Sequence, residues 1–491
     1  MGRKIKVHAH VIETQEKEVT MFPSIRKLIF SGCLFAAMAT VSQVVAESPA
    51  QKPNIILIFA DDVGFGDLGC YGSPRSTPEI DRLAREGFRS TDCLVAANVC
   101  GPSRAAMMTG RYPMRCGHPI SRHNTPKYAK YGIAAEELTL AELLKTAGYH
   151  NKMVGKWHLG FHVDGSHPLD AGFDEYLGLH SNYSDSHGDA DTLYRNREVQ
   201  EAKIKFEKVT TLYTDEVVDF INEKRNEPFF IYFSHHIAHS PILPSKPFQG
   251  TSGKGRASAY ADFLLELDHS VGRVRTAVQD AGLADNTLVV FLSDNGPAKN
   301  GSAKPLSGGK YVTMEGGHRV PAIFYWPGRI PAGQVSGAMI TSMDLLPLFG
   351  HVASIEPPSD RTIDGKNIID LLTGKTNQSP HHYFYYYNGL NLQAVRNERW
   401  KLHLPRTIAD QPYWAKKAGG NPKKKLLSLN QPLLFDLDHD VSEQKNVLSQ
   451  HPEVASKLMS QVERIRAEIG DVNATGSDQR PHGLINPNSK D

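Results

Sequence analysis

Apolar runs that alternate with amphipathic stretches constrain the fold of this chain more than any other feature of its sequence. Runs rich in β-branched and aromatic residues are typical of strands buried on both faces, and the stretches between them have helical spacing. Strands that alternate with helices predict an α/β fold, with a large, mostly parallel sheet sandwiched by helices. The predicted strands begin at residues 54, 151, 228 and 287, and the predicted helices span residues 77–87, 136–148, 212–223 and 257–282.

The character of the sequence changes after about residue 374. Short apolar stretches with turns between them predict an antiparallel sheet, and residues 452–470 predict a helix. We therefore expect a main domain over residues 47–376 and a smaller α+β subdomain over residues 377–491. The last stretch, residues 471–491, is polar, so we expect it to be frayed.

The first 46 residues predict a secretory signal peptide, with Met21 as an alternative start. A short basic region, SIRK from Ser24, precedes a mostly apolar stretch, and VVA before Glu47 is a plausible cleavage site. The apolar stretch is too short and too interrupted to favour a membrane-spanning helix. Lipid attachment at Cys33 is the weaker alternative. We expect an exported protein, periplasmic or secreted.

The charge of the chain argues against a nucleic-acid partner. Its 491 residues carry a net charge of +2, and 22% of them are charged, as in ordinary globular proteins. The basic run KKAGGNPKKK, residues 416–425, predicts a solvated loop because no aromatic residues interleave with its lysines.

Four cysteines remain after the leader: Cys70, Cys93, Cys100 and Cys116. Cysteines of exported proteins usually form disulfides, and four are too few for a disulfide-based scaffold. If Cys100 has a special role, the pairing among the other three stays open.

Two polar pairs follow predicted strands, at the edge of the sheet where open α/β folds bind ligands. Asp61 and Asp62 follow the first strand, and Asp294 and Asn295 follow the last. This all-oxygen set suits a hard cation, Ca²⁺ or Mg²⁺. Zinc would require His or Cys at a metal-binding spacing that the chain lacks.

The two remaining predicted strands are followed by basic residues. Lys156 and His158 are two positions apart, so on an extended segment they project to the same side. Together they could neutralise an anion and transfer a proton. His235, His236 and His239 follow the strand that begins at residue 228.

The run VCGPSRAAMMTGRYP, residues 99–113, predicts a helix with Pro102 in its first turn and an end near Gly110. Cys100 would lie at the N-terminus of this helix, where free N–H groups and the dipole stabilise an anion. Arg104 follows one turn later on the same face, where its guanidinium can reach an oxyanion. The arrangement could lower the pKa of the thiol, so an ordinary cysteine nucleophile is one hypothesis.

The CGPSR run from Cys100 and the TGR run from Thr109 resemble the signature of the formylglycine-dependent sulfatases. In that family the cysteine is oxidised after translation to an aldehyde, formylglycine. Other runs resemble family motifs in the expected order: GKWHLG from Gly155, LSDNG from Leu292, GGK from Gly308 with EGG from Glu315, and AVR, WKL and LFDL in the C-terminal part. The resemblance extends from Asn54 to about Asn446, and the HHIAHSP run is closest to the arylsulfatase A branch.

The resemblance implies an alkaline-phosphatase-like fold and the hydrolysis of sulfate esters. The hydrated aldehyde attacks sulfur through one hydroxyl, and the second hydroxyl then lets the intermediate collapse and release sulfate, which a serine could not do. The resemblance and the expected export together imply a sulfated polysaccharide or oligosaccharide as substrate. The resemblance also implies a formylglycine-generating enzyme as the partner during maturation.

The resemblance also implies roles for individual residues. The implied metal ligands are Asp61, Asp62, Asp294, Asn295 and the modified Cys100. Arg104 would hold the hydrated aldehyde, and Lys156 and Lys310 would neutralise sulfate oxygens as charge shifts in the transition state. His158 would be the base that breaks the sulfated enzyme, and His239, which fits a His-x-Pro pattern, would be the acid for the leaving group.

Several alternatives stay open. His236 is the other candidate for the leaving-group acid, and Ser181 and Ser184 are both available as a substrate-binding serine. A phosphonate monoester or phosphodiester hydrolase of the same superfamily is an alternative activity, because phosphate and sulfate esters are similar tetrahedra. A glycan-binding protein without catalysis is a further alternative if Cys100 is unmodified.

Overall fold

Strand β1 (Asn54–Ala60) lies at the centre of the main sheet and is buried along its whole length. Ile55 and Leu57 pack into one hydrophobic core, and Ile56 and Ile58 pack into the other. Successive side chains of a strand point to opposite faces, so a strand covered on both faces has to be apolar throughout.

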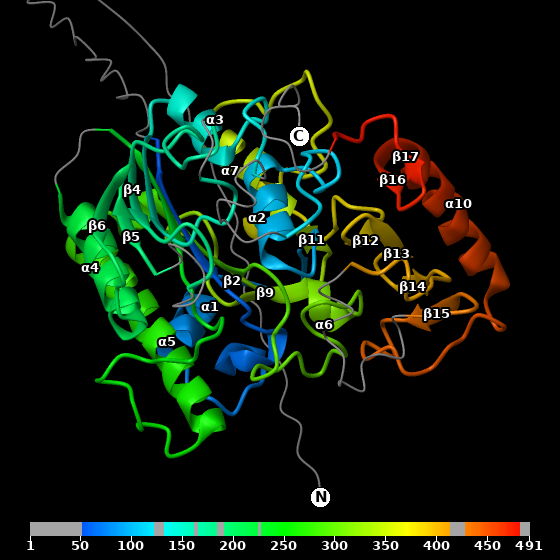
Figure 1. Ribbon diagram of the computed structural model, residues 1–491, viewed down its shortest axis with the longest axis horizontal. Coiled ribbons are helices and arrows are strands. Elements are labelled where there is room, and N and C mark those ends of the chain that lie inside the picture. Colours follow the sequence, from blue (N-terminus) through cyan, green and yellow to red (C-terminus); the bar gives the residue numbers. More distant parts are fainter. Residues whose placement is uncertain are drawn as a thin grey trace, which may run out of the picture. The chain divides into compact units, whose positions relative to one another are not determined.

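The computed structural model describes residues 52–121, 132–161, 165–183, 191–223, 227–412 and 428–481 (Figure 1). The predicted leader and the basic run at residues 416–425 lie outside this part of the chain. The other strands of the main sheet are β2 (Phe88–Leu94), β3 (His150–Gly155), β4 (Glu175–Gly178), β5 (Leu193–Arg195), β6 (Glu198–Glu201), β7 (Phe229–Ser234), β8 (Thr287–Ser293), β9 (Arg319–Tyr325), β10 (Gln334–Ser336) and β11 (Ile340–Thr341).

Within the described residues these strands form an 11-stranded sheet in the order β10-β2-β9-β8-β1-β7-β3-β4-β5-β6, with β11 beside β2. The central run β8-β1-β7-β3-β4 is parallel. Strand β9 is antiparallel to both β2 and β8, and β5 is antiparallel to β4 and β6. The prediction of a mostly parallel sheet is confirmed.

Helices cover both faces of the sheet, as predicted. One face carries α1 (Pro78–Glu86), α4 (Val209–Asn222) and α5 (Arg256–Asp280), and the other carries α2 (Cys100–Thr109), α3 (Leu140–Thr146), α7 (Leu345–Val352) and α8 (Ile369–Leu372). In Figure 1, α4 and α5 lie together on one side of the strands, and α2, α3 and α7 lie on the other.

Helix α3 is shorter than predicted. It begins at Leu140 because Thr139 and Glu142 form a capping box, in which each side chain accepts a hydrogen bond from the backbone N–H of the other residue.

The predicted antiparallel sheet is also present. It consists of β12 (Phe384–Asn388), β13 (Asn391–Arg396), β14 (Trp400–His403) and β15 (Leu433–Asp436), and α10 (Pro452–Ile469) packs against it. Its apolar residues share one cluster with Leu94 of β2 and Ala106 of α2, so this sheet packs directly on the element that carries Cys100.

The prediction of a frayed end is wrong for residues 471–481. Strand β16 (Gly470–Asp471) pairs with β17 (Ala474–Thr475), and Arg480 forms ion pairs with Glu136 at 3.0 Å and with Glu137 at 2.7 Å. A polar segment looks frayed in the sequence because its charged partners lie more than three hundred residues away.

In the part of the chain that the structure describes, no helix combines the length and the apolarity needed to cross a bilayer. Cys70, Cys93, Cys100 and Cys116 are all free thiols there, so none of them forms a disulfide with another.

Candidate active site

The polar residues that follow four strands meet at one edge of the sheet, because β8, β1, β7 and β3 are neighbours in that order. Asp61 and Asp62 follow β1, and Asp294 and Asn295 follow β8. All four side chains are buried, with at most 2% of their surface exposed.

Cys100, the first residue of α2, points its thiol into this carboxylate group. Its Sγ lies 3.3 Å from Asp61 Oδ1 and 4.0 Å from Asp62 Oδ1, and Lys310 Nζ donates to it over 3.3 Å. Burial, followed by the charge of Asp61, raises the pKa of this thiol well above its ordinary value, although Lys156 and Lys310 oppose the shift. The lowered pKa expected from a helix N-terminus is therefore not found at this thiol, because burial and Asp61 outweigh the helix dipole and the two lysines.

The carboxylates have the composition of a site for a hard cation. Donor atoms of Asp61, Asp62, Asp294 and Cys100 all lie within 4.8 Å of one another. The Oδ1 atom of Asn295 is buried and accepts no hydrogen bond from any described residue. A buried amide oxygen without a partner beside three carboxylates fits the all-oxygen coordination of Ca²⁺ or Mg²⁺.

The backbone brings these oxygens together under strain. Asp62 has a positive φ of 62°, which few residues other than glycine adopt and which is concentrated at functional sites. Its N–H donates to Asp294 Oδ1 over 3.0 Å, and its Oδ1 accepts from Asn295 Nδ2 over 2.7 Å.

Three buried cations balance the three carboxylates. Lys156 Nζ lies 2.5 Å from Asp61 Oδ2, and Lys310 Nζ lies 2.6 Å from Asp62 Oδ1. Burial alone would raise the pKa of Asp61, but Lys156 and the other nearby cations hold it well below its ordinary value. Burial and the charge of Asp61 raise the pKa of Asp294 to about 7.

Arg104 is completely buried behind the cluster. Its Nε and Nη2 donate to Asp294 Oδ2 over 3.2 and 2.9 Å, and its Nη1 donates to Ser234 Oγ over 2.6 Å. The guanidinium is therefore held in one orientation, with Nη2 3.8 Å from Asp61 Oδ1.

Lys310 lies on a loop that other parts of the chain hold in place. Its backbone N–H donates to Pro297 O over 3.0 Å, and the N–H of Tyr311 donates to Asn98 O over 3.1 Å. The Nδ2 atom of Asn388, in the C-terminal sheet, donates to Tyr311 O over 3.1 Å.

The loop ends in α6 (Glu315–His318), which a buried ionic network anchors to the C-terminal sheet. Glu443 Oε2 accepts from the N–H of Glu315 over 2.7 Å, and Lys401 Nζ lies between the two carboxylates, 2.9 Å from Glu315 and 3.1 Å from Glu443. The sequence motifs that contain these residues could be recognised, but their role in anchoring the loop to the C-terminal sheet could not. Lys401, a charged residue between apolar neighbours in strand β14, was the available signal.

The histidines differ in their position. The His239 side chain is 20% exposed, with Nε2 4.0 Å from Asp62 Oδ2 and Nδ1 2.7 Å from Ser240 O. His236 is buried, and its Nε2 lies 3.2 Å from Ser181 O. Burial lowers the pKa of both imidazoles, further at His236.

His158 is buried, and its carbonyl oxygen lies 3.6 Å from where a Cβ atom on Gly101 would be. Its φ of 64° shows that His158 is not in an extended conformation, so the extended segment on which Lys156 and His158 were expected to project to the same side is not present there. Ser184 lies outside the described residues.

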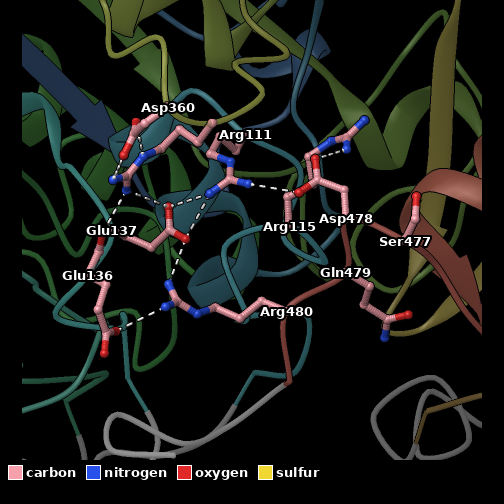
Figure 2. Close-up of a pocket in the computed structure, with 10 residues that line it drawn as sticks. Arg111, Arg115, Glu136, Glu137, Asp360, Ser477, Asp478, Gln479 and Arg480 are labelled. Carbon is pink, nitrogen blue, oxygen red and sulfur yellow. Dashed lines mark hydrogen bonds and ion pairs between the residues drawn. The ribbon is translucent and has the colours of Figure 1, made fainter.

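A hollow apart from the carboxylate cluster, with a volume of about 290 Å³, is lined by arginines and carboxylates (Figure 2). Arg111, the last residue of the TGR run, lies 2.9 Å from Glu137, which also pairs with Arg480 at 2.7 Å. Arg115 pairs with Asp478. These arginines all form ion pairs with carboxylates. The ion pairs around the hollow therefore connect the C-terminal segment with the residues that follow α2.

The sheet and its helices form an alkaline-phosphatase-like fold, with a buried carboxylate cluster at the carboxyl edge of the sheet that could hold a cation. A family model described as Sulfatase matches residues 53–355, and a model described as the C-terminal region of aryl-sulfatase matches residues 379–489. The chain belongs to the sulfatase family, and it is a sulfuric ester hydrolase.

Two curated relatives and one solved structure illustrate this membership. The chain is 42% identical to N-acetylgalactosamine-6-sulfatase of Homo sapiens over 386 residues, which cover 73% of each chain. It is 34% identical to arylsulfatase A of Homo sapiens over 480 residues, 88% of this chain and 91% of the relative. The structure of Ps i-CgsB in complex with k-i-k-neocarrahexaose has a TM-score of 0.74 and 29% identity, and covers 88% of this chain and 94% of its own.

Proposed function

We propose that this sulfatase is an exported enzyme that hydrolyses sulfate esters of a polysaccharide or oligosaccharide, with formylglycine at position 100 and a bound divalent cation. The observation that carries the proposal is the position of the Cys100 thiol, between two carboxylates and the ammonium of Lys310. A formylglycine hydrate at this position would supply a hydroxyl nucleophile and, through its second hydroxyl, a way to release sulfate.

The cation would be held by Asp61, Asp62, Asp294 and Asn295, and it would supply Lewis-acid stabilisation of developing negative charge. Either Ca²⁺ or Mg²⁺ suits the donors. With Asp61 and Asp62 serving a cation, the ammonium groups of Lys156 and Lys310 that now pair with them would be available to sulfate oxygens.

Each remaining residue has a proposed role that suits its surroundings. Lys156 and Lys310 bind the sulfate oxygens and stabilise the charge that shifts onto them in the transition state. Arg104 orients residue 100 and Asp294 from behind. His239, partly exposed and near Asp62, donates a proton to the leaving alcohol.

The roles of the other polar residues follow the same logic. His158 acts as the base that accepts a proton from residue 100. The distance of His239 from Asp62 favours it over His236 as the acid, since His236 is directed to Ser181 O. Ser181, Ser184 and His236 are proposed to contact substrate.

The names of the relatives support a carbohydrate substrate, because one of them is a sulfatase of N-acetylgalactosamine and the matched structure holds a neocarrahexaose. The predicted leader at residues 1–46 supports export, either to a periplasm or out of the cell. A formylglycine-generating enzyme would act on Cys100 during maturation.

The test is mass spectrometry of the peptide that contains residues 99–104, from protein made in a host with the converting enzyme. A mass that corresponds to an aldehyde in place of the thiol, with turnover of an aryl sulfate and slower turnover of an aryl phosphonate, supports the proposal. An unmodified cysteine in active enzyme would contradict it.

A further inference from the structure

A pocket of about 370 Å³ adjoins two of the loops that carry site residues. Ser240, Pro241 and Ile242 line it and directly follow His239. Asn300, also in its wall, belongs to the segment that runs from Asn295 to Lys310. Both walls therefore belong to chain segments that also carry residues of the proposed catalytic site. The volume of the pocket lies in the range of ligand pockets, about 300–1,000 Å³.

The imidazole of His239 connects this pocket with the carboxylates. Its Nε2 faces Asp62 at 4.0 Å, and its Nδ1 lies 2.7 Å from the carbonyl oxygen of Ser240 in the pocket wall. A group that received a proton from His239 would lie at this boundary, so the part of the substrate beyond the leaving oxygen has the pocket as its neighbour.

The pocket has an unbalanced positive charge. Arg256, the first residue of α5, lines it, is exposed and makes no ion pair with any described residue. No carboxylate is among the lining residues. By contrast, the arginines of the hollow in Figure 2 are paired with carboxylates, and Arg273 on the same helix as Arg256 pairs with Asp215 at 2.6 Å.

We propose that this pocket, which we name the Arg256 pocket, binds a sugar unit that adjoins the sulfated one and that carries its own anionic group. A guanidinium without a competing carboxylate pairs readily with a sulfate or a carboxylate, since it presents two parallel N–H donors to either group. The polar groups of Ser240 and Asn300 suit the hydroxyls of a sugar ring. The inference rests on the proposed function, because it assumes that the sulfate ester is on a glycan.

The test compares the steady-state kinetics of the converted enzyme and its Arg256→Ala variant on four substrates. They are an aryl sulfate and three sulfated disaccharides whose second unit is neutral, sulfated or a uronic acid. We expect Arg256→Ala to raise KM about tenfold on a disaccharide with a charged second unit, with little change in kcat. KM for the aryl sulfate and for the neutral disaccharide should stay within about twofold, and Arg256→Lys should restore part of the loss. The charged disaccharide with the larger loss shows whether the anion is a sulfate or a carboxylate.

Arg273→Ala is the matched control, since it removes an arginine from the same helix outside the pocket. Equal KM for wild type and Arg256→Ala on both charged disaccharides would overturn the proposal, as would an equal loss on the aryl sulfate. Calorimetric titration of the same disaccharides into Cys100→Ala protein, with and without Arg256→Ala, measures binding without turnover. A complete absence of turnover in the wild type would then contradict the proposed function, while the calorimetry would still decide the occupancy of the pocket.

Discussion

Glu443 accepts a hydrogen bond from the backbone N–H of Glu315 over 2.7 Å, and this contact connects the C-terminal sheet with the loop that carries Lys310. The same carboxylate pairs with Lys401 at 3.1 Å and with His403 at 2.7 Å, and all four residues are buried. The C-terminal sheet is thus part of the scaffold of the active site.

Replacing Glu443 with alanine should therefore lower both stability and activity. The change removes the carboxylate partner of His403 and one of the two carboxylates that pair with Lys401, all of them buried. We therefore expect a loss of about 1–3 kcal/mol in the free energy of unfolding, measured by urea titration. Glu453→Ala, at an exposed position of α10, is the control and should change it by less than about 0.5 kcal/mol. A Glu443→Ala protein with wild-type stability would show that the network carries no such energy.

Lys310→Ala should lower kcat roughly 100-fold, because one buried donor to the sulfate oxygens is lost. Thermal melting by circular dichroism shows whether the variant is folded. Lys304→Ala removes an exposed lysine of the same loop and should leave kcat unchanged. An effect of Lys310→Ala on KM alone would contradict a role in the transition state.

Chelation of the cation should abolish activity and lower Tm. Without the ion, Asp61, Asp62 and Asp294 remain crowded within the same 4.8 Å cluster, and a ligand that binds only the folded state contributes to its stability. Activity regained with Ca²⁺ alone or with Mg²⁺ alone identifies the ion. Full activity in protein shown by elemental analysis to be metal-free would exclude the proposed site.

Gly155→Ala should unfold or severely destabilise the protein. A Cβ atom there would lie 1.8 Å from the carbonyl oxygen of Ser234, the β7 residue whose hydroxyl Arg104 contacts. Gly148→Ala is the matched control: its φ of 83° is also positive, but nothing lies within 4 Å of its Cβ position. We expect about 1–2 kcal/mol of destabilisation from backbone strain at Gly148 and more than about 3 kcal/mol at Gly155, by urea denaturation. Similar values at the two positions would show that the close approach of β3 and β7 is not rigid.

The contribution of Glu216 to stability should disappear in acid. Burial opposes the shift, but hydrogen bonds from Arg195 and Lys152 lower the pKa of this carboxyl from 4.5 to about 2. A carboxyl whose pKa is lower in the folded state stabilises it fully above pH 4.5 and progressively less as the pH falls towards 2. The difference in Tm between wild type and Glu216→Gln should therefore shrink over that interval, and a constant difference would contradict the shift. Glu198→Gln, an exposed neighbour on β6, should show a much smaller difference throughout.

Local sequence patterns determined the elements and the inventory of the site. The strand that begins at residue 54 and the helix at 257–282 were predicted within two residues of β1 and α5, because hydrophobic periodicity is a property of adjacent residues. The positions of Asp61, Asp62, Asp294 and Asn295 at strand ends were visible for the same reason, as was the start of α2 at Cys100.

Tertiary structure decided which of these residues meet and what their charges do. Asp62 and Asn295 are 233 positions apart, and the adjacency of β1 and β8 brings the two together. The sequence favoured a lowered pKa for Cys100 from its place at a helix N-terminus, but burial beside Asp61 raises it. Desolvation and charge–charge interaction depend on distance in space. For that reason the raised pKa of the Cys100 thiol, the anchoring of Lys310 through Glu443 and the ordered segment around Arg480 appear only in the folded chain.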